Sequence, residues 1–223
     1  MIKKIVKCNK KPEILAITPL SPGDRISIDT KKSVKRNRTP FVWISYMGKN
    51  NPYKNVDIAY KQYRRENGVV PKYVIKIDND IKVSKHWLDK MYKALESGKP
   101  EIAYSYTSFE FTGAINIKFP LRKFDPDYLL KMNYISSCSL VKTQLLDQIG
   151  GFVTDDKYFR LLDWALWLKF LRFGFIGQPV ENAHFCAYAS PTSVSCRSAE
   201  DYKEKALAIK EDFINPVINK NNP

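Results

Sequence analysis

Residues 73–80 read Tyr73-Val74-Ile75-Lys76-Ile77-Asp78-Asn79-Asp80, a short apolar run that ends in two aspartates. Such runs suit a strand that is buried on both faces of a parallel sheet. In open α/β sheets, ligand-binding loops follow the carboxyl ends of these strands. The stretch therefore predicts a buried strand over residues 73–77 and a ligand-binding loop directly after it.

Outside this stretch, segments of strand and helix character alternate along the chain. This alternation predicts an α/β domain with a mainly parallel central sheet flanked by helices. Residues 112–133 show no clear period, and we expect them to form a loop that shapes a substrate pocket. The predicted strands are 14–17, 41–46, 73–77, 102–111 and 185–189, and the predicted helices are 25–38, 55–67, 84–95 with Ser84 as its cap, 139–149, 158–173 and a last one over 202–213.

The composition is that of a folded chain. The 223 residues are 44% hydrophobic and 27% charged, which excludes global disorder. We expect one domain over residues 1–215 and a linker-like tail over 216–223 that either frays or leads to a further domain. The four cysteines, Cys8, Cys138, Cys186 and Cys196, have no C-x-x-C spacing. We interpret them as reduced thiols of a cytoplasmic protein without a transmembrane segment.

The chain is strongly basic, with 37 Lys and Arg against 23 Asp and Glu and a net charge of +14. A surface of this charge attracts phosphates, nucleotides, anionic glycans and anionic lipids. The excess is densest in residues 31–38, which hold five basic residues and no acid. Such a run forms either a solvated helix face or a patch that faces anions or a membrane. A peripheral contact with an anionic surface is therefore one expectation.

Asp78 and Asp80 are the first candidates for chemistry. In an extended segment, side chains two residues apart face the same way, so both carboxylates can converge on one hard cation such as Mn²⁺ or Mg²⁺. The alternative is a polar turn with a capping aspartate. Lys76 lies on the same face, where it either neutralises one aspartate or approaches a phosphate.

Asp163 is the second candidate, because it interrupts an otherwise apolar segment, residues 161–168. A buried acid must be paired, hydrogen-bonded or functional. One interpretation is a salt bridge to Arg160 or Lys169. The other is a general base whose pKa is raised by apolar surroundings, with Trp164 and Trp167 as a platform for a sugar ring.

Three motifs in this order and spacing resemble family 2 glycosyltransferases of the GT-A fold, over most of residues 14–195. They are the strand followed by Asp78-Asn79-Asp80, the stretch that ends in Gly150-Gly151-Phe152, and Asp163-Trp164-Ala165-Leu166-Trp167. The resemblance implies a nucleotide-sugar donor, with UDP-sugars favoured. It also implies a divalent metal that bridges the donor diphosphate to the aspartate loop, and an aspartate that deprotonates the acceptor hydroxyl.

Carried over position by position, the resemblance implies a donor-binding set at the carboxyl ends of the first and third strands. Asp78 and Asp80 would lie at the ribose and the metal, and Asp163 would be the base. The remaining donor-binding positions would be Thr18, Pro19, Arg25 and Asn79.

The chain departs from the family pattern at three positions. Leu162 stands where the family usually has a second acid beside the base. The acid that commonly ends the second strand is missing from residues 44–48. Ser190 falls where many relatives have a metal-binding histidine, which leaves His184 either as a substitute metal ligand or as a hydrogen-bonded strand-end residue.

These observations predict a metal-dependent glycosyltransferase that moves a sugar, with inversion, to a hydroxyl of a glycan or glycoconjugate. Two alternatives are a basic nucleic-acid-binding protein or metal-dependent nuclease, and an inactive glycan-binding module. The sequence has no helix-turn-helix, zinc-finger or RRM signature, so we expect no nucleic-acid partner. We expect a cytoplasmic enzyme that is peripheral to a membrane.

Overall fold

The computed structural model describes residues 2–6 and 11–215, so the expected tail over residues 216–223 and Cys8 lie outside the described residues. The described strands are β1 (Ile2–Val6), β2 (Ile14–Leu20), β3 (Phe41–Met47), β4 (Tyr73–Lys76), β5 (Ile81–Val83), β6 (Ile102–Gly113), β7 (Ile117–Phe119), β8 (Leu140–Lys142) and β9 (Ile176–Ala189). The helices are α1 (Ile28–Val34), α2 (Pro52–Asn67), α3 (Trp87–Glu96), α4 (Pro126–Lys131), α5 (Thr143–Gln148), α6 (Leu162–Arg172) and α7 (Ala199–Ile209).

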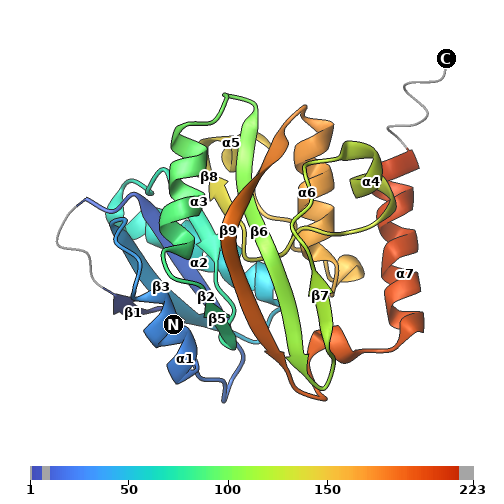
Figure 1. Ribbon diagram of the computed structural model, residues 1–223, viewed down its shortest axis with the longest axis horizontal. Coiled ribbons are helices and arrows are strands. Elements are labelled where there is room, and N and C mark those ends of the chain that lie inside the picture. Colours follow the sequence, from blue (N-terminus) through green and yellow to red (C-terminus); the bar gives the residue numbers. More distant parts are fainter. Residues whose placement is uncertain (1, 7–10, 216–223) are drawn as a thin grey trace.

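The strands join in one sheet in the order β1-β3-β2-β4-β8-β6-β9-β5, with β7 paired to β6 (Figure 1). The predicted α/β class, with helices flanking a central sheet, is confirmed. The sheet is mixed rather than purely parallel. Parallel pairs join β3, β2 and β4 and join β6 to β9, whereas the short strand β8 runs antiparallel to both β4 and β6.

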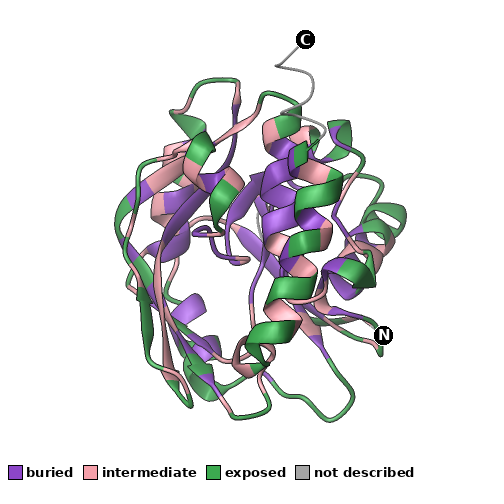
Figure 2. Ribbon diagram, turned by 90° about the vertical axis from the view of Figure 1, so that its right-hand side faces the viewer, coloured by how far each residue is buried: buried purple, intermediate pink, exposed green. Residues whose placement is uncertain are grey.

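Strand β2 separates two hydrophobic cores. Its side chains alternate between them, so that Leu15 and Ile17 pack with α2 and α6, while Ile14 and Ala16 pack with α1 and α3. All four are fully buried, and each large one contributes about 1.5–3 kcal/mol of burial free energy. Figure 2 shows buried residues on the central strands and on the inward sides of the helices.

Strand β2 is longer than predicted, because it continues through Pro19 to Leu20. The Ile17 carbonyl accepts the Ile77 N–H at 2.9 Å, at the point where β4 ends. Pro19 lies two residues further, so its nitrogen faces the same side, where β4 no longer offers an acceptor. A proline at this point removes no ladder hydrogen bond.

Two predicted helices differ from the structure. The segment 139–149 is the strand β8 followed by the short helix α5. The segment 158–173 becomes an α-helix only at Leu162, because Arg160 has a φ of 87°, in the left-handed region that interrupts a right-handed helix. The unassigned residues 112–133 hold β7 and α4.

The start of α3 also differs from the prediction, since Ser84 does not cap it. The N-cap residue is His86, and the Oδ1 of Asn37 accepts the Leu88 N–H at 2.8 Å. The cap therefore comes from the segment after α1, about fifty residues earlier in the chain.

The described cysteines Cys138, Cys186 and Cys196 are free thiols, as expected. Within residues 2–6 and 11–215, no helix combines the length and the apolar character that a membrane span requires.

Candidate active site

The loop Asp78-Asn79-Asp80 leaves β4 at the edge of the sheet where the parallel strands β2, β3 and β4 end. Its backbone is fixed from two sides. The Asn79 carbonyl accepts the Ser27 N–H at 2.8 Å and the Thr30 hydroxyl at 3.0 Å, and the Asp80 carbonyl accepts the Tyr188 N–H at 3.1 Å. The start of α1 and the end of β9 thus hold the loop in place.

Asp78 uses both carboxylate oxygens within the protein. Its Oδ1 accepts from the Lys76 ammonium, and its Oδ2 accepts from the Ser137 hydroxyl at 3.2 Å and the Cys138 thiol at 3.4 Å. Lys76 itself is only 6% exposed and also donates to Ser137 at 3.0 Å. Burial alone would raise the pKa of Asp78, but Lys76 and these hydrogen bonds lower it below its usual value. Lys76 was expected either to neutralise an aspartate or to approach a phosphate. In the structure it pairs with Asp78 and neutralises it.

Asp80 differs from Asp78, because its half-buried carboxylate accepts only from its own backbone N–H and receives no hydrogen bond or ion pair from the side chain of a described residue. Burial, together with the charge of Asp78, raises the pKa of Asp80 to about 6. Mg²⁺ commonly takes one or two carboxylates and completes its shell with substrate phosphates and water. The free carboxylate of Asp80 fits a metal of this kind, whereas a metal at Asp78 would compete with Lys76.

His184 does not lie with the two aspartates. Strand β9 pairs Ala187 with Ile81, the residue after Asp80, so His184 lies three residues further along, about 10 Å at the rise of a strand. Its backbone pairs with Ser84, and its side chain is exposed. Among the described residues, no group of three or more His, Cys, Asp and Glu side chains could hold a metal ion.

Asp163 lies in the first turn of α6, where the helix dipole favours a negative charge. Its Oδ1 accepts the Trp164 N–H at 2.9 Å. The predicted salt bridge is wrong, because Arg160 contacts Asp201 and backbone carbonyls, and Lys169 donates to the Gly151 carbonyl.

The pKa of Asp163 is raised to about 6, chiefly by burial. The Trp164 N–H, the charge of Lys76 and a hydrogen bond from Asn133 act in the opposite direction. A carboxylate of this pKa is mostly ionised at pH 7 and still binds a proton well enough to act as a base.

Trp164 and Trp167 do not form the predicted sugar platform, because they are 1% and 0% exposed. Their indole N–H groups donate to the carbonyls of Leu129 at 2.7 Å and Ile135 at 3.0 Å. The Trp167 ring also stacks on Tyr104, with centroids 4.4 Å apart. Both indoles are core residues that fix α6, and with it the position of Asp163.

Of the remaining donor-binding candidates, Pro19 and Arg25 can still contact a ligand, whereas Thr18 cannot. The Thr18 hydroxyl is fully buried and accepts the Trp43 indole N–H at 2.9 Å, so it is not free for a ligand. Pro19 is half-buried near the end of β2. Arg25 is exposed, and its carbonyl accepts from the Asn79 side chain at 3.4 Å.

Sequence reasoning missed Tyr53 of α2, which is buried and whose hydroxyl has no hydrogen-bond partner among the described residues. Burial and the charges of Asp163 and Asp78 raise the pKa of Tyr53 well above its usual value. The Lys76 ammonium lies 5.7 Å from the centre of the ring. Lys76 and Tyr53 thus connect the aspartate loop to Asp163. A lysine inside an apolar strand was the one signal in the sequence that pointed to this cluster.

Comparisons with known protein families and with curated proteins give no match. Solved structures do match in fold. S. aureus TarS, a glycosyltransferase, superimposes with a TM-score of 0.64 at 13% identity, over 91% of this chain and 40% of TarS. TarS 1-349 in complex with UDP gives 0.60 at 15% identity, and its complex with UDP-GlcNAc gives 0.59 at 12%. These two matches cover 91% of this chain and 66% and 67% of the TarS chains.

At these identities the likeness establishes the fold, which is of the GT-A glycosyltransferase type. This chain spans less than half the length of TarS.

Proposed function

We propose that this protein is an inverting glycosyltransferase that moves a sugar from a nucleotide-diphosphate donor to a hydroxyl acceptor. The observation that carries the proposal is Asp163, an acid with a pKa of about 6 and no ion pair with a described residue, held near the aspartate loop by an apolar helix. The complexes of TarS with UDP and UDP-GlcNAc support a UDP-sugar as the donor.

Asp163 is the general base in the proposed reaction. The acceptor hydroxyl attacks the anomeric carbon from the face opposite the diphosphate, and Asp163 takes the hydroxyl proton as the new bond forms. The bond between the sugar and the diphosphate breaks, and the nucleoside diphosphate leaves. The buried indoles of Trp164 and Trp167 keep Asp163 in place during this step.

The donor lies against the aspartate loop in this proposal, with Asp80, Asn79, Arg25 and Pro19 as its contacts. Mn²⁺ or Mg²⁺ held at Asp80 would supply positive charge to the leaving diphosphate. Asp78 shapes the loop through Lys76 rather than binding the metal directly.

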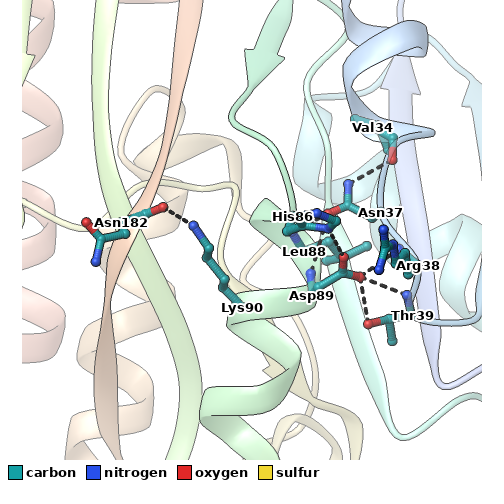
Figure 3. A network of polar contacts seen from close by, with 9 residues as sticks. All are labelled: Val34, Asn37, Arg38, Thr39, His86, Leu88, Asp89, Lys90 and Asn182. Carbon is teal, nitrogen blue, oxygen red and sulfur yellow. Dashed lines mark hydrogen bonds and ion pairs between the residues drawn. The ribbon is translucent and has the colours of Figure 1, made fainter.

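We also propose that α1 and the turn after it contact an anionic surface. Lys31, Lys32, Lys35 and Arg36 are exposed, and none forms an ion pair with a described residue. The nearby acid Asp89 does not pair with them. Its carboxylate accepts instead the backbone N–H groups of Arg38 and Thr39, the Thr39 hydroxyl and the His86 ring (Figure 3).

These hydrogen bonds also fix the basic segment against α3, so its charges stand on a rigid surface. The acceptor in this proposal is a glycan or glycoconjugate. The protein would be a cytoplasmic enzyme at the periphery of a membrane.

A donor panel tests the proposal. Each UDP- and GDP-sugar is incubated with the protein and Mn²⁺ or Mg²⁺, and release of the nucleoside diphosphate is followed, with Asp163→Asn as the matched control. We expect release with at least one UDP-sugar, strongly reduced in the variant. Donor binding without release by the wild type would indicate an inactive glycan-binding module. Neither binding nor release, together with cleavage of a nucleic-acid substrate, would favour the nuclease alternative.

A further inference from the structure

Lys76 is a buried cation in the middle of the site, and the glycosyl-transfer proposal gives it no role of its own. Its side chain is 7% exposed, although it lies in a strand whose other residues are apolar. A buried ammonium is retained only where it is paired and hydrogen-bonded, because its desolvation costs several kcal/mol. Here its partners are Asp78 and Ser137, and the ring of Tyr53 lies 5.7 Å away.

The pairing divides the two aspartates of the loop. Asp78 accepts from Lys76 on one oxygen and from Ser137 and Cys138 on the other. Asp80 accepts no side-chain donor from the described residues. A divalent ion that arrived at the loop would meet one free carboxylate, that of Asp80, and one carboxylate, that of Asp78, whose charge the Lys76 ammonium already neutralises.

We propose that the Lys76 ammonium is a built-in cation of the donor site, which occupies Asp78 and leaves Asp80 as the single carboxylate for a divalent ion. The proposal concerns the metal-binding part of the glycosyl-transfer site and rests on that function only for the identity of the donor. With Lys76 in place, the free protein binds a divalent ion weakly. The phosphates of a bound donor complete the ion's shell.

Removing the ammonium should therefore increase affinity for the metal alone. In Lys76→Met, Asp78 and Asp80 are both available and the repulsion by Lys76 is gone. We expect Mn²⁺ affinity, measured by calorimetry without donor, to increase about tenfold or more. Adding Asp80→Ala to Lys76→Met should abolish the gain.

The matched control is Lys82→Met, which removes an exposed lysine from β5, directly after the same loop. This variant changes the net charge equally and should leave Mn²⁺ affinity within about twofold of the wild type. Circular dichroism establishes that each variant is folded. Unchanged Mn²⁺ affinity in folded Lys76→Met, or an equal gain in Lys82→Met, would overturn the proposal.

A second measurement applies even where Lys76→Met does not fold. Mn²⁺ is titrated into the wild type with UDP present, and the titration is repeated with Asp80→Asn and Asp78→Asn. We expect Asp80→Asn to lose Mn²⁺ binding. Asp78→Asn should weaken it less, because Asp80 is still available although the unpaired Lys76 ammonium now repels the ion, and equal losses would contradict the division of roles. Because both titrations follow metal binding, they stand apart from any failure to transfer sugar.

Discussion

The aspartate loop after β4 and the first turn of α6 each carry an acid within electrostatic range of Lys76, yet the two acids behave in opposite ways. In the loop, Asp78 is paired with Lys76, and its pKa is lowered. On α6, Asp163 contacts no cation among residues 2–6 and 11–215, and burial raises its pKa to about 6. The difference shows that Lys76 can hold one nearby carboxylate, that of Asp78, in an ion pair while a second carboxylate, that of Asp163, stays available to accept a proton.

The largest expected effect separates these two roles. Asp163→Asn keeps the shape of the side chain and the hydrogen bond from Trp164 but cannot take a proton. Transfer should fall by about 10² to 10⁴-fold, with donor affinity little changed. Initial rates and calorimetric donor titrations measure the two quantities.

Asp78→Asn is the comparison variant, because it leaves the Lys76 ammonium without its carboxylate. This variant should lower the melting temperature, whereas Asp163→Asn should not. If Asp163→Asn is folded, binds donor and transfers at the wild-type rate, Asp163 is not the base.

The pH dependence is the next largest effect. Since Asp163 must be ionised to accept a proton, transfer should increase with pH up to about 6 and level off above it. A flat profile from pH 5 to 8 would contradict the assignment.

Stability should show the opposite trends for the two acids. The raised pKa of Asp163 means that its favourable contribution is present below the unfolded pKa and is lost as pH rises through about 6. The lowered pKa of Asp78 means that its contribution is present above the unfolded pKa and is lost as pH falls through the folded value. Melting curves between pH 3 and 8 for both variants should therefore lie closest to the wild type at low pH, where both acids bind a proton. With rising pH they should diverge in opposite directions, Asp163→Asn becoming more stable than the wild type and Asp78→Asn less stable.

Much of the loop could be predicted from the sequence, because its signals are local. The apolar run before Asp78 predicted a buried strand, and strand periodicity placed Lys76 on the face of that acid. The partners Ser137 and Cys138 could not be predicted, because the segment before β8 reaches Asp78 only through strand pairing across about sixty residues. The three-residue strand β8 was not predicted, because it forms through pairing with β4 and β6 rather than through a strand pattern in its own sequence.

The surroundings of Asp163 were harder to predict. The apolar segment correctly marked its acid as unusual, but Trp164 and Trp167 looked equally suited to a sugar platform or a core. Their indole N–H groups donate to the carbonyls of Leu129 and Ile135, which lie in or just after a segment without a readable period. The sequence could not exclude a salt bridge to Arg160, because the groups that its side chain contacts instead lie just before α7, about forty residues later in the chain.

The smallest expected effect concerns the basic segment on α1, which borders the aspartate loop without forming it. The variant replaces four of its five exposed cations, Lys31, Lys32, Lys35 and Arg36, with Gln. Binding to phosphatidylglycerol vesicles should weaken. The slope of log affinity against log salt should fall by up to about 0.7–0.9 for each lipid phosphate that the variant no longer neutralises, a value measured for nucleic acids that we use as a guide.

The matched control replaces four other exposed cations without ion pairs among the described residues, Arg65, Lys93, Lys131 and Lys203. Both variants lose the same net charge, so a specific surface predicts a larger loss of vesicle binding for the α1 variant. Hydrolysis of free donor should stay near the wild-type rate in both, because exposed charges are screened within about 10 Å at moderate salt. A loss of donor hydrolysis in the α1 variant would instead place these cations at the donor phosphates. The basic segment would then belong to the same region of the molecule as Asp78 and Asp80.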